Sequence, residues 1–150
     1  MPSDTFDRSL RVDRSPEECW QVLTDVQRVA GWVTVASDVS EIEPLEEYSA
    51  VLSDSFGPFN LNADIGVEVL DVEEGRSIHF KGSGQDRQVK TNISVEAWME
   101  LEPEEDGTVI HVHGSWNVLG TVATMGGGTI RKKADKIVDE FFAAAETELG

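Results

Sequence analysis

Histidines are the first residues to consider for chemistry, because imidazole is a common metal ligand and catalytic group. His111 and His113 lie two residues apart in a run of alternating apolar and polar residues, and His79 lies in an earlier run of the same kind. The alternation places all three imidazoles on the face of their strands that is turned away from the buried side. No cysteine or acid stands at ligand spacing beside them in the sequence. We therefore predict surface histidines and no metal site.

Little else in the chain suits catalysis, which needs a nucleophile with its base or a titratable pair in a cleft. The single cysteine, Cys19, falls on the apolar face of a predicted helix, where a thiol packs as a small hydrophobic group. Asp64 and Glu68 alternate toward the polar side of their strand, so inward acids are not evident. The polar side chains available to line a cavity are Tyr48, Asn117, Thr121 and Thr129. We predict no catalytic residue and no cofactor.

A run of three glycines, Gly126, Gly127 and Gly128, precedes the last helical segment. The run lacks the lysine and the spacing of a phosphate-binding loop, and it follows no strand of a β-α-β unit. Each glycine costs a helix about 1 kcal/mol relative to alanine, so three together need a reason. Two explanations remain open: a bent or late helix start, or a flexible lid at the mouth of a cavity.

After the glycines, the chain has the pattern of one long amphipathic helix. Its apolar positions recur every three or four residues, at Ile130, Ala134, Ile137, Val138, Phe141, Phe142, Ala145 and Leu149. Such a stripe must be covered, and nearly everything before it has the two-residue period of β-strands. The partner of the helix is therefore the face of a sheet.

The elements that precede this helix are a strand, a helix pair and a series of strands. Phe6 to Val12 alternates as an opening strand; Ser15 and Pro16 then start a helix, and a second helical piece covers Val26 to Trp32. Further strands are predicted near residues 39–42, 48–52, 59–72, 78–80, 91–101 and 109–116, with a loop over residues 82–88. Short turns between them indicate an antiparallel meander. We predict an α+β fold in a single domain, residues 1–150, with a curved antiparallel sheet of six to seven strands wrapped around the C-terminal helix.

The composition limits the possible partners. The net charge is −17, with 29 acids and 12 Lys and Arg residues, so the chain repels nucleic acid and anionic lipid surfaces. No apolar run is long enough for a membrane span, and the N-terminus lacks the pattern of a signal peptide. A lone cysteine fits a reducing compartment. We expect a cytoplasmic protein with no nucleic-acid partner and no stable membrane insertion, in which the acidity reflects solubility, a high-salt habitat or a dock for a basic protein.

The order of these elements resembles the helix-grip fold of the START-like (SRPBCC) superfamily, also called Bet-v-1-like. Within it, the chain is most similar to the CoxG family, which takes its name from carbon monoxide dehydrogenase. Several segments carry the likeness: residues 15–25 (SPEECWQVLTD), 48–51 (YSAV), 56–59 (FGPF), the Gly107-Thr108 entry to the last strand, and residues 114–123. These segments belong to the scaffold and are not a catalytic signature, so they support the fold more than an activity.

The resemblance implies a pocket, and a curved sheet cannot touch one straight helix everywhere. The residues expected to line this cavity are Trp32, Tyr48, Phe56, Phe59, Phe80, Trp116, Met125, Ile130 and Phe141, with Gly126, Gly127 and Gly128 at its mouth. We expect non-enzymatic binding of a lipid, quinone or aromatic metabolite. The likeness to CoxG further implies an accessory role beside a molybdenum hydroxylase-type partner. Two alternatives stay open: a polyketide cyclase or aromatase-type enzyme, and an interaction module like the START-like activators of the Hsp90 chaperone.

Overall fold

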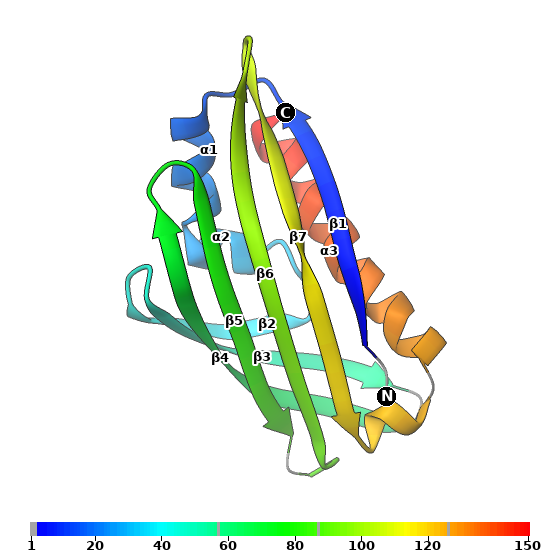
Figure 1. Ribbon diagram of the computed structural model, residues 1–150. Coiled ribbons are helices and arrows are strands. Elements are labelled where there is room, and N and C mark those ends of the chain that lie inside the picture. Colours follow the sequence, from blue (N-terminus) through cyan, green and yellow to red (C-terminus); the bar gives the residue numbers. More distant parts are fainter. Residues whose placement is uncertain (1–2, 57, 87, 126) are drawn as a thin grey trace.

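The computed structural model describes residues 3–56, 58–86, 88–125 and 127–150 and has the predicted α+β fold. One curved sheet of seven antiparallel strands stands in front of helix α3 in Figure 1, with α1 and α2 also behind it. In chain order the elements are β1 (Ser3–Val12), α1 (Pro16–Leu23), α2 (Val26–Ala30), β2 (Ala36–Glu43), β3 (Glu47–Phe56), β4 (Phe59–Glu73), β5 (Ser77–Asp86), β6 (Thr91–Glu104), β7 (Gly107–Gly120), the 3-10 turn η1 (Val122–Met125) and α3 (Gly127–Leu149).

The two short helices begin at side-chain caps. The Ser15 hydroxyl accepts a hydrogen bond from the backbone N–H of Glu18 at 3.2 Å, and Pro16 occupies the first turn of α1. The Asp25 carboxylate caps α2 in the same way. α2 ends at Ala30, two residues before the predicted end, and Trp32 lies in the turn that follows. The helix pair carries the chain from β1, at one edge of the sheet, to β2, at the other edge.

The strand order is β1-β7-β6-β5-β4-β3-β2, so only the first strand departs from a simple meander. The register aligns inward positions of four neighbouring strands in rows. One row consists of Ile65, Gly84, Ile93 and Val118, and the next consists of Val67, Gly82, Val95 and Trp116. Each row contains a glycine, which leaves the inner surface without a side chain at that point.

Strand β5 corrects one sequence prediction. It continues to Asp86, whereas the glycine-rich sequence predicts a loop from Gly82. The reason is a close approach of two strands: a Cβ atom on Gly84 would lie 1.9 Å from the carbonyl oxygen of Asp64 in β4. Glycine therefore permits the pairing here instead of breaking the strand.

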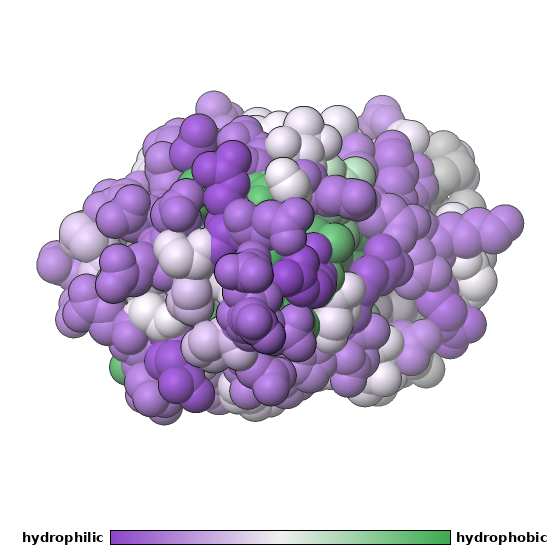
Figure 2. Space-filling view, turned by 90° about the horizontal axis from the view of Figure 1, so that it is seen from above, coloured by the Kyte–Doolittle hydropathy of each residue, from purple (hydrophilic) through white to green (hydrophobic). Residues whose placement is uncertain are grey.

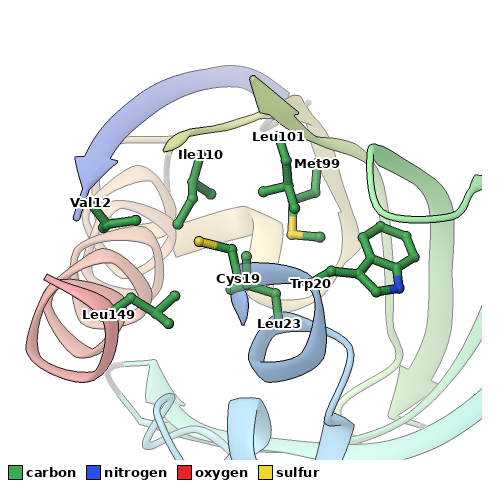
Figure 3. Close-up of a cluster of buried hydrophobic side chains, with 8 residues drawn as sticks. All are labelled: Val12, Cys19, Trp20, Leu23, Met99, Leu101, Ile110 and Leu149. Atoms are coloured by element: carbon green, nitrogen blue, oxygen red, sulfur yellow. The ribbon is translucent and has the colours of Figure 1, made fainter. Parts of the chain in front are cut away.

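The buried residues form two separate clusters at opposite ends of α3. The first cluster consists of Val12, Cys19, Trp20, Leu23, Met99, Leu101, Ile110 and Leu149. Figure 3 shows α1 and the end of α3 directing these side chains toward β6 and β7. The second cluster consists of Leu61, Ala63, Val118, Val122 and Ile130, near the start of α3. Cys19 is fully buried, as predicted, and desolvation raises the pKa of its thiol, which suits a packing role.

Candidate functional site

Helix α3 spans the concave side of the sheet and is tied to strands on both sides of it. On β1, Arg8 pairs with Asp139, and Asp4 pairs with Arg131 at 2.6 Å. Toward the opposite edge, the polar contacts are Thr34 with Glu140 (3.0 Å), Arg28 with Glu148 (3.5 Å) and Asp54 with Lys133 (3.2 Å). The central strands β4, β5 and β6 therefore face α3 from between two lines of polar contacts.

The apolar residues between the two clusters are only partly buried. They come from the inner face of the sheet and from the apolar stripe of α3: Ile65, Val67, Phe80, Ile93, Val95, Val112, Trp116, Ala134, Ile137, Val138 and Phe141. On the same stripe, Ile130, Phe142, Ala145 and Leu149 are at most 7% exposed. In the view from above, apolar atoms are also visible between and below hydrophilic residues (Figure 2). The middle of the helix-sheet interface is thus more accessible to solvent than its two ends.

Trp32 and Phe141 mark the border between the first cluster and this accessible region. Their ring centroids lie 5.6 Å apart with 57° between the planes, and both side chains pack against the first cluster. Phe141 also meets Phe142 edge-on at 5.2 Å. These two predicted lining residues are therefore in contact, one from the turn after α2 and one from α3.

The other predicted lining residues with described side chains are distributed over both ends of the interface. Phe80 lies opposite Ala97 on the inner face. Trp116 packs against the second cluster, to which Ile130 belongs. Tyr48 is buried, and its hydroxyl accepts a hydrogen bond at 2.7 Å from the backbone N–H of Leu45, in the turn before β3. This hydroxyl stabilises a turn and is not directed toward a ligand.

Some predicted residues lie at the limit of what the structure describes. Gly126 is outside the described residues, as are the side chains of Phe56, Phe59 and Met125. Gly127 begins α3, and Gly128 follows within the helix, where an added Cβ atom would meet nothing within 4 Å. Helix α3 thus starts inside the glycine run, and packing does not require glycine at residue 128.

Sequence reasoning missed one charged pair on the inner side. Asp54 lies opposite Leu61 in the register, so its carboxylate points inward, where its side chain is 17% exposed and meets Lys133 Nζ at 3.2 Å. The expectation that inward acids are absent is therefore wrong. The alternation of residues 48–52 carries this information if it is extended by one pair of residues toward Phe56.

Two hollows lie on the outer face of the sheet, away from α3. The larger has a volume of about 970 Å³ and is lined mainly by polar residues: Asn62, Asp64, Ser83, Gly84, Gln85, Asp86, Gln88, Asn92, Ile93, Ser94, Asn117 and Leu119. The smaller, of about 350 Å³, lies over β3 and β4. Asn117, a candidate for a polar group inside the predicted cavity, thus belongs to the outer face.

A buried acid borders the larger hollow. The Asp86 carboxylate accepts hydrogen bonds from the backbone N–H groups of Asn62 (2.7 Å), Gln88 (2.9 Å) and Val89 (3.3 Å). These bonds, that from Asn62 first, lower the pKa of Asp86. Asp86 is therefore a structural acid that joins the β5–β6 turn to β4.

The histidines lie on the outer face, as predicted, but they have acidic neighbours. Glu100 pairs with His111 in the register, and its Oε1 lies 2.7 Å from Nε2 of His113. His79 meets Glu96 at 2.8 Å. The expectation that no acid stands beside the histidines is wrong, because these neighbours come from adjacent strands and not from adjacent sequence positions.

The comparison with protein families covers almost all of this architecture. The family model of CoxG, a component of carbon monoxide dehydrogenase, matches residues 9–150, from the middle of β1 to the end of α3. The chain belongs to the CoxG family. The resemblance drawn from residues 15–25 and the strand pattern is thereby confirmed.

Solved structures show the same START-like fold as this CoxG family member. A conserved protein from Geobacillus kaustophilus has a TM-score of 0.83 at 20% identity, over 97% of this chain and 94% of that chain. A START superfamily protein from Mycobacterium smegmatis has a TM-score of 0.71 at 14% identity, over 97% and 96%. The di-domain ARO/CYC protein StfQ from the steffimycin biosynthetic pathway has a TM-score of 0.64 at 10% identity, over 97% of this chain and 50% of that chain. These likenesses establish the helix-grip fold and leave the activity to the site itself.

No curated relative matches the CoxG-family sequence. Among the described residues, no helix is both long enough and apolar enough to cross a membrane.

Proposed function

We propose that this CoxG family member binds a small hydrophobic molecule between the inner face of the sheet and α3, without changing it chemically. The observation that carries the proposal is the partly exposed apolar surface between the two buried clusters. Surface of this kind in the centre of a domain is costly to leave wet, and a bound ligand gains about 25 cal/mol for each Å² of apolar area removed from water. Trp32, Phe80, Trp116 and Phe141 supply the aromatic part of this surface.

The Asp54–Lys133 pair supplies a polar group at one end of this surface. Both side chains are partly shielded from solvent, so a hydrogen bond to a ligand is stronger here than on an open surface. The pair lies on the side of the second cluster, since Lys133 is three residues after Ile130 on α3. A ligand with one polar end and an apolar body fits this arrangement, and quinones and lipids have that form.

The enzyme alternative lacks suitable groups among the described residues. Tyr48 gives its hydroxyl to a turn, and Asn117 lies on the outer face. Asp54 is paired with a lysine, which favours its ionised form and not that of a general acid. The alternative of an interaction module without a pocket predicts a uniformly buried interface, whereas the middle of this one is accessible to solvent.

The family membership supports a protein partner as well. The CoxG name connects the family with carbon monoxide dehydrogenase, and we propose that this chain acts in the cytoplasm as an accessory protein beside a molybdenum hydroxylase-type enzyme. The net charge of −17 suits a basic docking surface on such a partner, since complementary charge accelerates association.

Extraction of the purified protein with organic solvent, followed by mass spectrometry, tests the ligand proposal. We expect a co-purifying apolar molecule with one polar end. We also expect 1,4-naphthoquinone or palmitate, used as probes, to raise the melting temperature, because a ligand that binds only the folded state stabilises it. Absence of an extracted molecule together with no shift by either probe would overturn the proposal.

A further inference from the structure

The outer face of the sheet carries a stack of four rings across β5, β6 and β7. The Trp98 ring lies between His79, at 4.2 Å and 11°, and His113, at 5.3 Å and 5°. His113 in turn stacks on His111 at 4.8 Å and 30°. Stacking holds the imidazoles of β7 in fixed orientations before any ligand arrives.

Glu100 completes a group of three potential metal ligands. Its Oε1 lies 2.7 Å from Nε2 of His113 and 3.8 Å from Nδ1 of His111. One ligand atom from each of the three residues falls within 4.8 Å of the other two. Ligand atoms around a tetrahedral zinc ion lie about 3.4 Å apart, so small side-chain rotations suffice to enclose an ion.

Asp7 provides an independent observation. Its Oδ1 lies 2.7 Å from Nε2 of His111, on the opposite side of the imidazole from Glu100. An ionised carboxylate only accepts hydrogen bonds, so Nε2 carries the proton and Nδ1 keeps its lone pair toward Glu100. A carboxylate that fixes the tautomer of a ligating histidine in this way is a regular part of zinc sites.

We propose that His111 Nδ1, His113 Nε2 and the Glu100 carboxylate bind a divalent transition metal ion of the zinc class. Two imidazoles and one carboxylate suit zinc, copper or nickel and not magnesium or calcium, which prefer oxygen ligands only. The two histidine side chains are 33% exposed and that of Glu100 is 51% exposed, so the fourth coordination position opens to solvent. The acidic surface raises the local concentration of cations. The sequence-based expectation of no metal site rested on missing acids, which the sheet register supplies.

Titration of zinc into chelator-treated protein, followed by calorimetry, tests the proposal. An excess of Mg²⁺ in the buffer occupies acidic surface positions that lack histidine. We expect one zinc ion per chain, at least 100-fold weaker binding for His113→Gln and His111→Gln, and about 10-fold weaker binding for Asp7→Asn, which removes only the orienting carboxylate. His79→Gln is the matched control, because His79 has the same exposed outer-face setting and its own acid, Glu96, but lies outside the ligand group.

The wild-type protein offers a second readout that needs no histidine variant. Co²⁺ or Cu²⁺ in the site lies close to the Trp98 ring through His113, so it quenches Trp98 fluorescence, and Trp98→Phe removes this quenching while zinc still binds. Binding that is absent under Mg²⁺, or that falls equally in His79→Gln and His113→Gln, would overturn the proposal and indicate adventitious cation binding by the acidic surface. Ligand binding at α3 is unaffected by either result, since that surface is on the opposite face of the sheet.

Discussion

Trp32 and Phe141 lie in contact, with 5.6 Å between ring centroids, and join the turn after α2 to the last third of α3. Both residues are partly exposed, so the pair closes one end of the accessible apolar surface without belonging to the fully buried core. Aromatic contacts of this geometry contribute energy beyond the area that they bury. The pair therefore both holds α3 in place and forms a wall of the proposed ligand site.

The contact can be measured with a double-mutant cycle of Trp32→Leu and Phe141→Leu. We predict a coupling energy of about 0.5–1.5 kcal/mol in the free energy of unfolding, obtained from urea denaturation. Strictly additive single effects would show that the two rings do not stabilise each other. The cycle is a test of the contact alone and does not depend on any ligand.

Two alanines on one face of α3 compare the accessible and the buried parts of the interface. Ala134 is partly buried, whereas Ala145, three turns later on the same side, is fully buried. We predict that Ala145→Phe destabilises the protein by about 1–3 kcal/mol through overpacking. Ala134→Phe is predicted to change the unfolding free energy by less than about 1 kcal/mol, because it enters open space. Equal destabilisation of the two variants by thermal or urea unfolding would argue for a filled interface.

Asp86 gives a prediction for the dependence of stability on pH. Its pKa is lowered in the folded state, first by the N–H of Asn62, so its stabilising effect is present above the unfolded pKa of about 3.9 and is lost as pH falls through the lower folded value. We predict that Asp86→Ala costs about 1–3 kcal/mol at neutral pH, because buried N–H groups lose their acceptor. The difference between variant and wild type should shrink below about pH 4 in acid titrations followed by circular dichroism. The exposed Asp64→Asn serves as the control, and a difference that stays constant with pH would contradict the prediction.

Gly128 tests the two explanations of the glycine run. An added Cβ atom there meets open space, so Gly128→Ala is predicted to raise the unfolding free energy by up to about 1 kcal/mol. If the run also acts as a lid, the same variant slows the release of bound 1,4-naphthoquinone in stopped-flow measurements. Gly114→Ala is the contrasting variant, since its Cβ atom would lie 2.1 Å from the carbonyl oxygen of Glu96, and it must destabilise the protein. A loss of stability in Gly128→Ala would show that the helix start requires glycine there.

Periodicity alone predicted the fold because each element buries one face. The stripe from Ile130 to Leu149 identified both α3 and its partner, and Ser15 with Pro16 located the start of α1. The errors arose where a neighbouring strand decides the outcome. Gly84 continues β5 because β4 approaches it closely, which the sequence of β5 does not reveal.

The candidate sites show the same limit. The aromatic residues of the inner face could be predicted from alternation, but the pairing of Asp54 with Lys133 depends on how α3 crosses β3. The acids beside His111 and His113 come from β1 and β6, more than ten residues away in the sequence. Cross-strand register, which one sequence does not specify, brings these groups together.

Ligand binding between the sheet and α3 is tested most directly by the melting temperatures of wild type and Ala134→Phe with increasing 1,4-naphthoquinone. We predict that the probe raises the melting temperature of wild type in a saturable way, and that the phenylalanine, which occupies the same space, abolishes the rise. A probe that stabilises neither protein, or both to the same extent, would contradict a ligand site between the sheet and α3.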